Sequence, residues 1–239
     1  PEIVDLARFL NQCGGCVRGA GTAEIVIEGG RPLHGTAYDP MPDRICASTL
    51  ACAAAAARGW VTVAGCAPGL YAPVLDILEQ AGCRVLRSAQ SATVGCAGGL
   101  RGAGRLVTGG YPALATDAAP LVAAALLTAR GQTVIEDRVF EARFGCAGGF
   151  AALGAAVRTM RGGRELWIEG AGGRPLHGAQ MAAGDLRGGA ALVVAALAAE
   201  GESRIAGCGY IDRGYPALEQ MLARLGARIC REMPPEAPD

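Results

Sequence analysis

Three runs of small and aliphatic residues recur along the chain, and each follows an aspartate by a few positions. The runs and their aspartates are 50–54 after Asp43, 121–125 after Asp117 and 191–195 after Asp185. Each run is followed by a glycine: Gly59, Gly131 and Gly201. Uninterrupted apolar runs closed by glycine predict buried helices. An aspartate near the start of such a helix can accept hydrogen bonds from its free backbone N–H groups.

A second set of elements follows each of these helices. Short β-branched runs predict strands at 61–63, 133–135 and 203–205. Apolar residues at three- and four-residue steps then predict amphipathic helices at 74–78, 150–153 and 218–222. The helices end at equally spaced glycines: Gly82, Gly154 and Gly226. Further strands are expected at 83–86, 156–158 and 227–229, with hairpins closing the pattern.

The chain is therefore predicted to consist of a repeated unit of about 70 residues, ordered helix, strand, helix, strand and hairpin. Three such units are expected between Asp43 and the end of the sequence. A helix at 3–10 and a strand at 17–18 match only the second half of a unit. The phrase Gly-Arg-Pro-Leu-His-Gly also occurs twice, at 30–35 and 173–178. We therefore expect the sequence to begin in the middle of a repeat, as the downstream part of a longer protein.

The composition narrows the possible classes of function. All 22 basic residues are arginine and they balance 22 acidic residues, so the formal net charge is zero. A neutral chain gives no electrostatic footprint for nucleic acid, and the absence of lysine excludes Schiff-base chemistry from this sequence. No run of about 18 uncharged apolar residues is present, so no membrane partner is expected.

The cysteines and histidines do not predict a metal or cofactor. Ten cysteines lie mostly beside glycine or alanine, where cysteine behaves as a small buried residue, and this favours a reducing, cytoplasmic location. The spacing of Cys13 and Cys16 suits a metal, but no second pair accompanies them. His34 and His177 stand in the two copies of the repeated phrase, far apart in sequence. No metal and no cofactor are expected.

Several phrases resemble the UDP-N-acetylglucosamine 1-carboxyvinyltransferases, a family of enolpyruvyl transferases that act in peptidoglycan synthesis. They are found, in order, at 1–5, 25–29, 42–45, 116–117, 139–144, 184–187 and 211–215. Asp-Leu-Arg (185–187) and Ile-Asp-Arg-Gly-Tyr (211–215) are the most specific of them. The match runs nearly the whole length of the chain. EPSP synthase shares the fold of this family but matches these phrases less closely.

The resemblance implies an α/β fold, the inside-out α/β barrel of EPSP synthase type, with two domains built from βαβαββ units. Residues 1–41 would complete the last unit of a truncated first domain, and 42–239 would form the second domain. The implied reaction transfers the enolpyruvyl group of phosphoenolpyruvate to the 3-hydroxyl of UDP-N-acetylglucosamine. The implied partners are these two substrates and the missing amino-terminal half, so the chain alone is expected to be inactive. Cell-wall biogenesis, cell shape and cell division would follow from this role.

The resemblance also assigns roles to individual residues. Asp117 matches the aspartate that contacts the sugar hydroxyl and would act as the base. The neighbouring Thr116 is expected to bind the substrate with it. Arg187 and Arg213 match residues that line the phosphoenolpyruvate side. Asp185, two residues before Arg187, is expected to be catalytic together with them and Asp117.

Val139 matches a position whose backbone contacts the uracil nucleotide, and Glu141 and Arg143 are interpreted as structural ion-pair partners near that pocket. Spacing alone, without the resemblance, favours structural roles: helix caps for the aspartates, ion pairs for the arginines and an ordinary strand residue for Val139.

Three departures from the family pattern leave other functions open. The chain has Ala118-Ala119 where the family has Met-Gln, Gly145-Cys146 where it has Met-His, and Gly184 where it has Thr. These changes remove polar groups around the implied pocket. A non-catalytic paralogue or scaffold with the same fold is therefore one alternative. EPSP synthase-like transfer to shikimate 3-phosphate is another, although its doubly anionic acceptor would call for more cationic groups.

Overall fold

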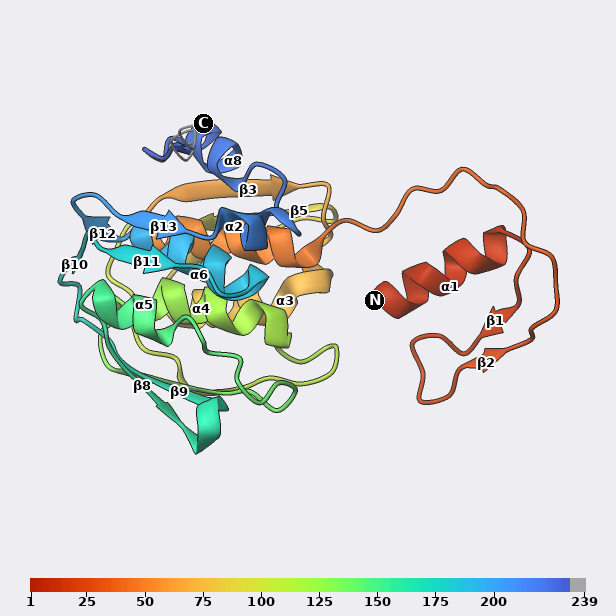
Figure 1. Cartoon of the computed structure of the whole chain (residues 1–239), viewed down its shortest axis with the longest axis horizontal. Coiled ribbons are helices and arrows are strands. Elements are labelled where there is room, and N and C mark those ends of the chain that lie inside the picture. Colours follow the sequence, from red (N-terminus) through yellow and green to blue (C-terminus); the bar gives the residue numbers. More distant parts are fainter. Residues whose placement is uncertain (233–239) are drawn as a thin grey trace, which may run out of the picture. The chain divides into compact units, whose positions relative to one another are not determined.

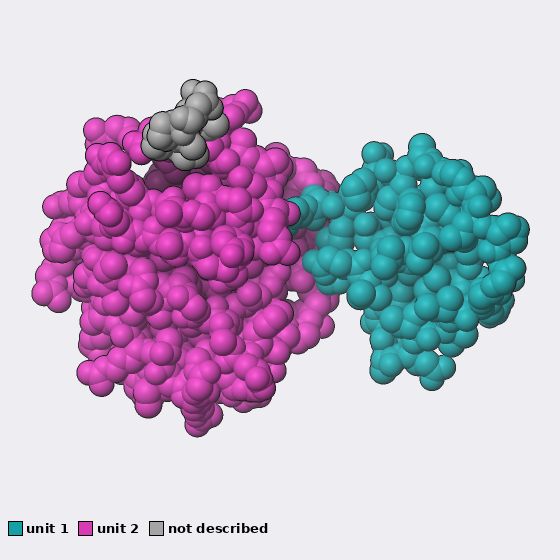
Figure 2. Space-filling view, in the orientation of Figure 1, with its two compact units in different colours: residues 1–43 teal, residues 44–239 magenta. Residues whose placement is uncertain are grey.

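The structure, a computed structural model, describes residues 1–232. The chain divides into two compact units, Pro1–Asp43 and Arg44–Asp239, which are coloured separately in Figure 2. Each unit is described by itself below.

The amino-terminal unit contains one helix and one small hairpin. Helix α1 (Glu2–Gln12) is followed by strands β1 (Val17–Arg18) and β2 (Val26–Ile27), which pair in antiparallel fashion. The Asn11 side chain joins the helix to the hairpin, because it accepts a hydrogen bond from the Val17 N–H (2.7 Å) and donates one to the Val17 carbonyl (2.8 Å). The predicted helix at 3–10 and strand at 17–18 are confirmed.

The larger unit alternates helices and strands, as labelled in Figure 1. Its α-helices are α2 (Arg44–Ala56), α3 (Ala72–Gln80), α4 (Ala119–Leu126), α5 (Ala147–Ala152), α6 (Leu186–Ala196), α7 (Cys208–Asp212) and α8 (Leu218–Arg224). Its strands are β3 (Trp60–Ala64), β4 (Arg84–Arg87), β5 (Ser91–Gly95), β6 (Gly104–Val107), β7 (Gln132–Glu136), β8 (Ala156–Met160), β9 (Glu165–Glu169), β10 (Leu176–His177), β11 (Gln180–Ala182), β12 (Ala199–Glu200) and β13 (Arg204–Ala206). Short 3₁₀ turns lie at Pro68–Tyr71, Thr116–Ala118 and Arg161–Gly163.

Three helices, α2, α4 and α6, pack against one another in the core of the larger unit. They correspond to the three apolar runs, and every residue of α4 is buried. Their many alanines let the backbones approach closely, which a helix of large side chains would prevent. The predicted buried helices and the amphipathic helices α3, α5 and α8 are therefore confirmed.

The sheets lie outside these helices (Figure 1). A three-stranded antiparallel sheet of order β3-β5-β4 covers α2, and a four-stranded mixed sheet of order β6-β7-β9-β8 contacts α4 through β7. The parallel pairs β10-β12 and β11-β13 follow, and β13 contacts α6. The larger unit therefore has its helices inside and its sheets outside. This is the arrangement that the resemblance to an inside-out α/β barrel implies.

The same glycine motif ends four of the helices. Gly14, Gly82, Gly154 and Gly226 each follow a helix with φ between +88° and +110°, a region that glycine adopts without strain. The N–H of the residue after each glycine donates to a carbonyl five positions earlier, as in a Schellman motif. In the two copies of the repeated phrase, the N–H of His34 donates to the Cys13 carbonyl (2.8 Å) and that of His177 to the Leu153 carbonyl (2.9 Å). The histidines thus occupy equivalent structural positions.

The strand predicted at 227–229 is wrong: these residues follow α8 without regular structure. In the earlier repeats, β4 and β8 each pair with a return strand, β5 or β9. The described residues after Ile229 are only 230–232, and they provide no such partner. A cavity of about 840 Å³ lies beside this segment, between Gly59–Val61, the end of α6 and residues 226–228. A strand forms only when its backbone finds a partner, which a local sequence pattern does not reveal.

An ion-pair network on the outer sheet predicts a pH dependence. Hydrogen bonds from Arg138 (2.9 Å) and Arg105 (2.6 Å) lower the pKa of Glu136 from 4.5 to about 2. The folded state therefore holds the charged form more tightly, so the stabilisation is present above pH 4.5 and is lost as the pH falls toward 2. We expect the melting temperature of Glu136→Gln to lie below that of the parent above pH 4.5 and to converge with it near pH 2. Thermal melting curves of both proteins between about pH 2 and pH 7 test this prediction. A difference in melting temperature that does not change with pH would contradict it.

Candidate functional site

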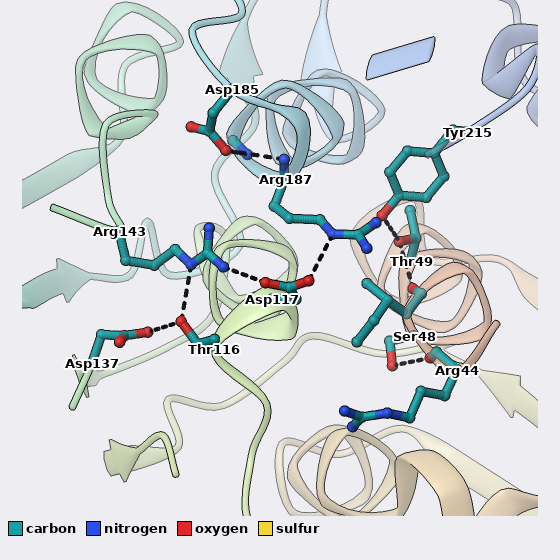
Figure 3. Close-up of polar contacts among 12 residues, drawn as sticks. Arg44, Ser48, Thr49, Thr116, Asp117, Asp137, Arg143, Asp185, Arg187 and Tyr215 are labelled. Carbon is teal, nitrogen blue, oxygen red and sulfur yellow. Dashed lines mark hydrogen bonds and ion pairs between the residues drawn. The ribbon is translucent and has the colours of Figure 1, made fainter. Parts of the chain in front are cut away.

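The amino-terminal ends of the three central helices meet at one place, shown in Figure 3. Asp185 and Arg187 stand at the start of α6, and Thr116 and Asp117 lie in the 3₁₀ turn just before α4. Thr49 lies in the second turn of α2. Side-chain contacts connect all three ends, and they bring together residues that are far apart in the sequence.

Asp117 lies between two arginines (Figure 3). Its carboxylate accepts hydrogen bonds from Nη2 of Arg143 and from Nε of Arg187, the latter at 3.2 Å. The Asp117 side chain is 37% exposed, whereas the side chains of Arg143 and Arg187 are 9% and 13% exposed. The carboxylate is therefore both oriented by two guanidinium groups and accessible to a ligand.

The two aspartates of the site have different local roles. The Asp185 side chain caps α6, since it accepts hydrogen bonds from the N–H groups of Arg187 (3.0 Å) and Gly188 (2.9 Å). The capping role that spacing alone allowed for Asp117 is wrong. Asp117 lies inside a 3₁₀ turn, and the start of α4 has no side-chain cap. Its oxygens are therefore directed at side chains.

Arg187 is held from the side opposite Asp117. Its guanidinium lies 5.3 Å from the ring centre of Tyr215, and the Tyr215 hydroxyl is hydrogen-bonded to that of Thr49 (2.8 Å). Burial opposes the charge on Arg187, but Tyr215 and Asp117 outweigh it and raise the pKa of the guanidinium. Burial also raises the pKa of the Tyr215 hydroxyl. Arg187 is thus a permanent cation.

One N–H group of Arg187 is left without a partner. Its Nη1 atom is buried and has no hydrogen bond within residues 1–232. Gly214 lies beside it: a Cβ at that position would be 3.6 Å from Nη1 and 2.9 Å from Leu186 Cδ2. The glycine of the phrase at 211–215 thus lets this segment pack closely on Leu186, next to the arginine. An unpaired buried donor is costly, so Nη1 of Arg187 needs a partner that residues 1–232 do not supply.

The turn before α4 is tied to the loop after β7. The Thr116 hydroxyl donates to Oδ2 of Asp137 (2.6 Å) and accepts from Nε of Arg143 (3.0 Å). Oδ1 of the same Asp137 accepts from the N–H groups of Val139 (2.8 Å) and Phe140 (2.7 Å). The loop that carries Val139 is therefore fixed by the same residue that contacts Thr116.

The structure brings together most of the residues singled out from the sequence. Thr116, Asp117, Asp185 and Arg187 lie in one cluster, and Val139 joins it through Asp137, with its own side chain 53% exposed. Arg213 is exposed at the end of α7 and contacts none of these residues. Its side chain has no ion pair within the described part of the chain. Its role stays a prediction.

Three further residues of the cluster were not assigned to it from the sequence. Asp137 and Thr49 carry no motif, and their contacts span 21 and 166 positions of the chain. Arg143 and Glu141 were interpreted together as ion-pair partners. The structure instead pairs Arg143 with Asp117, and Glu141 with Arg164 (2.8 Å). The position of Asp137 directly after a strand was the available signal, since polar residues at strand ends often serve sites.

The described residues give no indication of a metal centre or a membrane span. Within residues 1–232, no group of three or more His, Cys, Asp or Glu side chains is placed to hold a metal ion. In the same range, no helix has both the length and the apolar character needed to cross a bilayer.

Comparisons with known proteins identify relatives of the chain in sequence. The family model for EPSP synthase (3-phosphoshikimate 1-carboxyvinyltransferase) matches residues 1–222. UDP-N-acetylglucosamine 1-carboxyvinyltransferase 2 of Caldanaerobacter subterraneus subsp. tengcongensis is 39% identical over 98% of this chain and 55% of its own length. The enzyme of the same name from Desulfofundulus thermocisternus is 44% identical over 95% of this chain and 92% of its own. The chain thus spans about half the length of the first relative and nearly all of the second.

Two solved structures share the fold. The enolpyruvyl transferase NikO from Streptomyces tendae superposes with a TM-score of 0.79 at 29% identity, covering 93% of this chain and 52% of NikO. EPSP synthase from Acinetobacter baumannii superposes with a TM-score of 0.66 at 22% identity, covering 91% of this chain and 52% of that one. The expected EPSP synthase-type fold is confirmed.

Proposed function

Because this chain belongs to the EPSP synthase family and, within it, to the UDP-N-acetylglucosamine 1-carboxyvinyltransferases, we propose that it takes part in enolpyruvyl transfer from phosphoenolpyruvate to the 3-hydroxyl of UDP-N-acetylglucosamine. The observation that carries the proposal is Asp117, an accessible carboxylate held between two buried arginines. This is a suitable place for a base that removes a proton from a sugar hydroxyl.

Each residue of the cluster has a part in this proposal. Asp117 is the general base for the 3-hydroxyl proton, and Arg143 orients it. Arg187 and Arg213 bind the phosphate and carboxylate of phosphoenolpyruvate, since guanidinium groups suit these anions and Arg187 has a free N–H. Asp185 fixes the start of α6, and the backbone of Val139 binds the uracil nucleotide.

The reaction has two steps whose atoms balance. The sugar oxygen attacks C2 of phosphoenolpyruvate as Asp117 takes the hydroxyl proton, and an acid supplies a proton to the methylene carbon. In the second step a proton leaves the new methyl group to the same acid, the bond from C2 to the phosphate oxygen breaks, and the double bond is restored. The phosphate leaves with the proton that Asp117 took, so both groups return to their starting state. We assign the acid and further substrate contacts to the part of the relatives' length that lies outside the match. Residues 1–41 would belong with that part, and 42–239 would form one domain.

The departures from the family pattern lie mainly in the core. Ala118, Ala119 and Cys146 are all buried, so these three side chains pack inside rather than line an open pocket. This favours a working site over a scaffold. The identity of 39–44% to the UDP-N-acetylglucosamine enzymes, against 22% to EPSP synthase, favours the UDP-sugar as acceptor.

The proposed role places the protein in the cytoplasm, where peptidoglycan synthesis begins, and links it to cell-wall biogenesis, shape and division. Its ten cysteines are all free thiols, as expected in a reducing compartment. We propose no metal and no cofactor for the reaction.

Phosphate release tests the proposal. We expect the 239-residue chain alone to release no phosphate from phosphoenolpyruvate plus UDP-N-acetylglucosamine. Joined in one polypeptide to the amino-terminal part of the Caldanaerobacter enzyme, it should release phosphate only when both substrates are present. The matched control joins the same amino-terminal part to the relative's own carboxyl-terminal part. If that control is active while the chimera neither turns over nor gives a heat of binding with UDP-N-acetylglucosamine, the scaffold alternative is favoured.

A further inference from the structure

The carboxylate of Asp137 is the most completely buried charged group near the site. Asp137 is 1% exposed, and its two oxygens accept three hydrogen bonds of 2.6–2.8 Å. All three donors are neutral, and no ion pair to Asp137 exists within residues 1–232. Burying a carboxylate costs free energy unless hydrogen bonds or an ion pair compensate for the lost water. Here the compensation comes from the three hydrogen bonds, so we ask what they position.

One oxygen of Asp137 shapes the loop after β7. Oδ1 accepts from two successive N–H groups, those of Val139 and Phe140, and so turns the backbone inward at this point. Val139 and Phe140 themselves are each 53% exposed. This is the loop to which we assign nucleotide binding.

The other oxygen begins a chain of contacts that ends at Asp117. Oδ2 accepts from the Thr116 hydroxyl, which in turn accepts from Nε of Arg143. Nη2 of Arg143 then donates to Asp117 (Figure 3). Because the single hydroxyl proton of Thr116 is directed at Asp137, its oxygen lone pairs face Arg143. A carboxylate at 137 therefore fixes which way the Thr116 hydroxyl points.

A second contact joins the same two regions. The guanidinium of Arg143 lies 4.6 Å from the centre of the Phe140 ring, within the range of a cation–π interaction. The loop thus reaches Arg143 both through Asp137 and Thr116 and through the Phe140 ring. Movement of the loop and movement of Arg143 are coupled in this geometry.

We infer that Asp137 is a positioning residue that couples the nucleotide-binding loop to the general base, through Thr116 and Arg143. A UDP-sugar that orders residues 139–140 also fixes Arg143 and thereby the carboxylate of Asp117. This inference rests on the proposed function, but the contacts that it needs can be tested without substrate.

Exchange of the Arg143 Nε–H and of the loop amides, measured by ¹⁵N NMR on the full chain, tests the coupling. Thr116→Val removes the hydroxyl and keeps the shape, so the Arg143 Nε–H should exchange about tenfold faster, the change expected for one hydrogen bond. The amides of Val139 and Phe140 should change by less than about twofold. Thr116→Ser should restore slow exchange.

Two substitutions of Asp137 separate its two oxygens. Asp137→Asn can still accept from the loop amides, but its NH₂ group faces Thr116, so only the Arg143 Nε–H should exchange faster. Asp137→Ala should accelerate exchange of the Arg143 Nε–H and of the loop amides by about tenfold each. Asp76→Asn and Thr62→Val are matched controls at exposed positions away from the site, and they should change neither.

Several outcomes would overturn the inference. Unchanged exchange of the Arg143 Nε–H in Thr116→Val would do so, as would equal acceleration of the loop amides in the Asn and Ala variants. If Asp137→Ala does not fold, the comparison of Thr116→Val with Thr116→Ser alone decides whether the inference holds.

In the active chimera, Thr116→Val should lower kcat without raising KM for UDP-N-acetylglucosamine, whereas Asp137→Ala should change both. A KM increase in Thr116→Val equal to that in Asp137→Ala would contradict the coupling. An inactive chimera with the expected NMR pattern would count against the proposed function and leave the coupled contacts in place.

Discussion

Replacing Asp117 by asparagine is expected to lower kcat of the active chimera by about 10³-fold. General base catalysis by a positioned side chain contributes roughly 10²–10⁴-fold, and asparagine cannot accept the hydroxyl proton. The substitution also removes the counter-charge of two mostly buried arginines. Initial rates of phosphate release, with both substrates at saturation, measure the effect.

A matched control separates loss of the base from loss of the fold. Asp76→Asn makes the same chemical change on α3, where the aspartate forms an exposed ion pair with Arg87. We expect that variant to retain the parent rate within about twofold, since exposed ion pairs contribute little. Asp117→Asn should bind UDP-N-acetylglucosamine and melt cooperatively like the parent. A kcat within tenfold of the parent would remove Asp117 from the role of base.

Replacing Gly178 by alanine is expected to lower the free energy of unfolding by at least about 3 kcal/mol. The Gly178 N–H donates to the Glu200 carbonyl (2.7 Å), so the parallel chains of β10 and β12 lie in contact here. A Cβ on Gly178 would lie 2.1 Å from the carbonyl oxygen of Glu202 and 2.8 Å from its nitrogen. Both obstacles are backbone atoms, and they cannot move away without breaking the pairing. Urea denaturation measures the change.

Gly102 and Gly209 provide the comparison for this experiment. A Cβ on Gly102 would lie 2.4 Å from the Gln132 carbonyl oxygen, so Gly102→Ala should be similarly destabilising. Gly209 lies within α7 and has open space around it. Gly209→Ala should be neutral or stabilising by up to about 1 kcal/mol, because alanine favours helix. A loss below about 1 kcal/mol for Gly178→Ala would contradict the steric argument.

Local pattern was sufficient for the helices and most strands of this protein. The apolar runs that became α2, α4 and α6 are long and uninterrupted, and the glycines after α3, α5 and α8 adopt the backbone angles that require glycine. The missing strand at 227–229 shows the limit, because pairing depends on a partner elsewhere in the chain.

The site was predictable only in part, for the same reason. The phrases around Asp117 and Arg187 were specific enough to single out both residues, which the structure places in contact. The hydrogen bonds of Asp137 and Thr49 depend instead on how distant segments pack, and neither residue has neighbours that mark it. The pairing of Arg143 with Asp117 rather than Glu141 likewise follows from the meeting of the loop and the helix end.

The meeting of three helix starts bears on how a chain with no net charge would attract the anionic substrates of the proposed reaction. Each helix dipole places roughly half a positive charge at its amino-terminal end. At α6 the Asp185 carboxylate offsets this charge, whereas the start of α4 has no side-chain cap, so there the backbone itself supplies a local positive potential. This potential does not titrate and belongs to no side chain. It therefore persists at every pH at which the fold is intact, and no single substitution can abolish it.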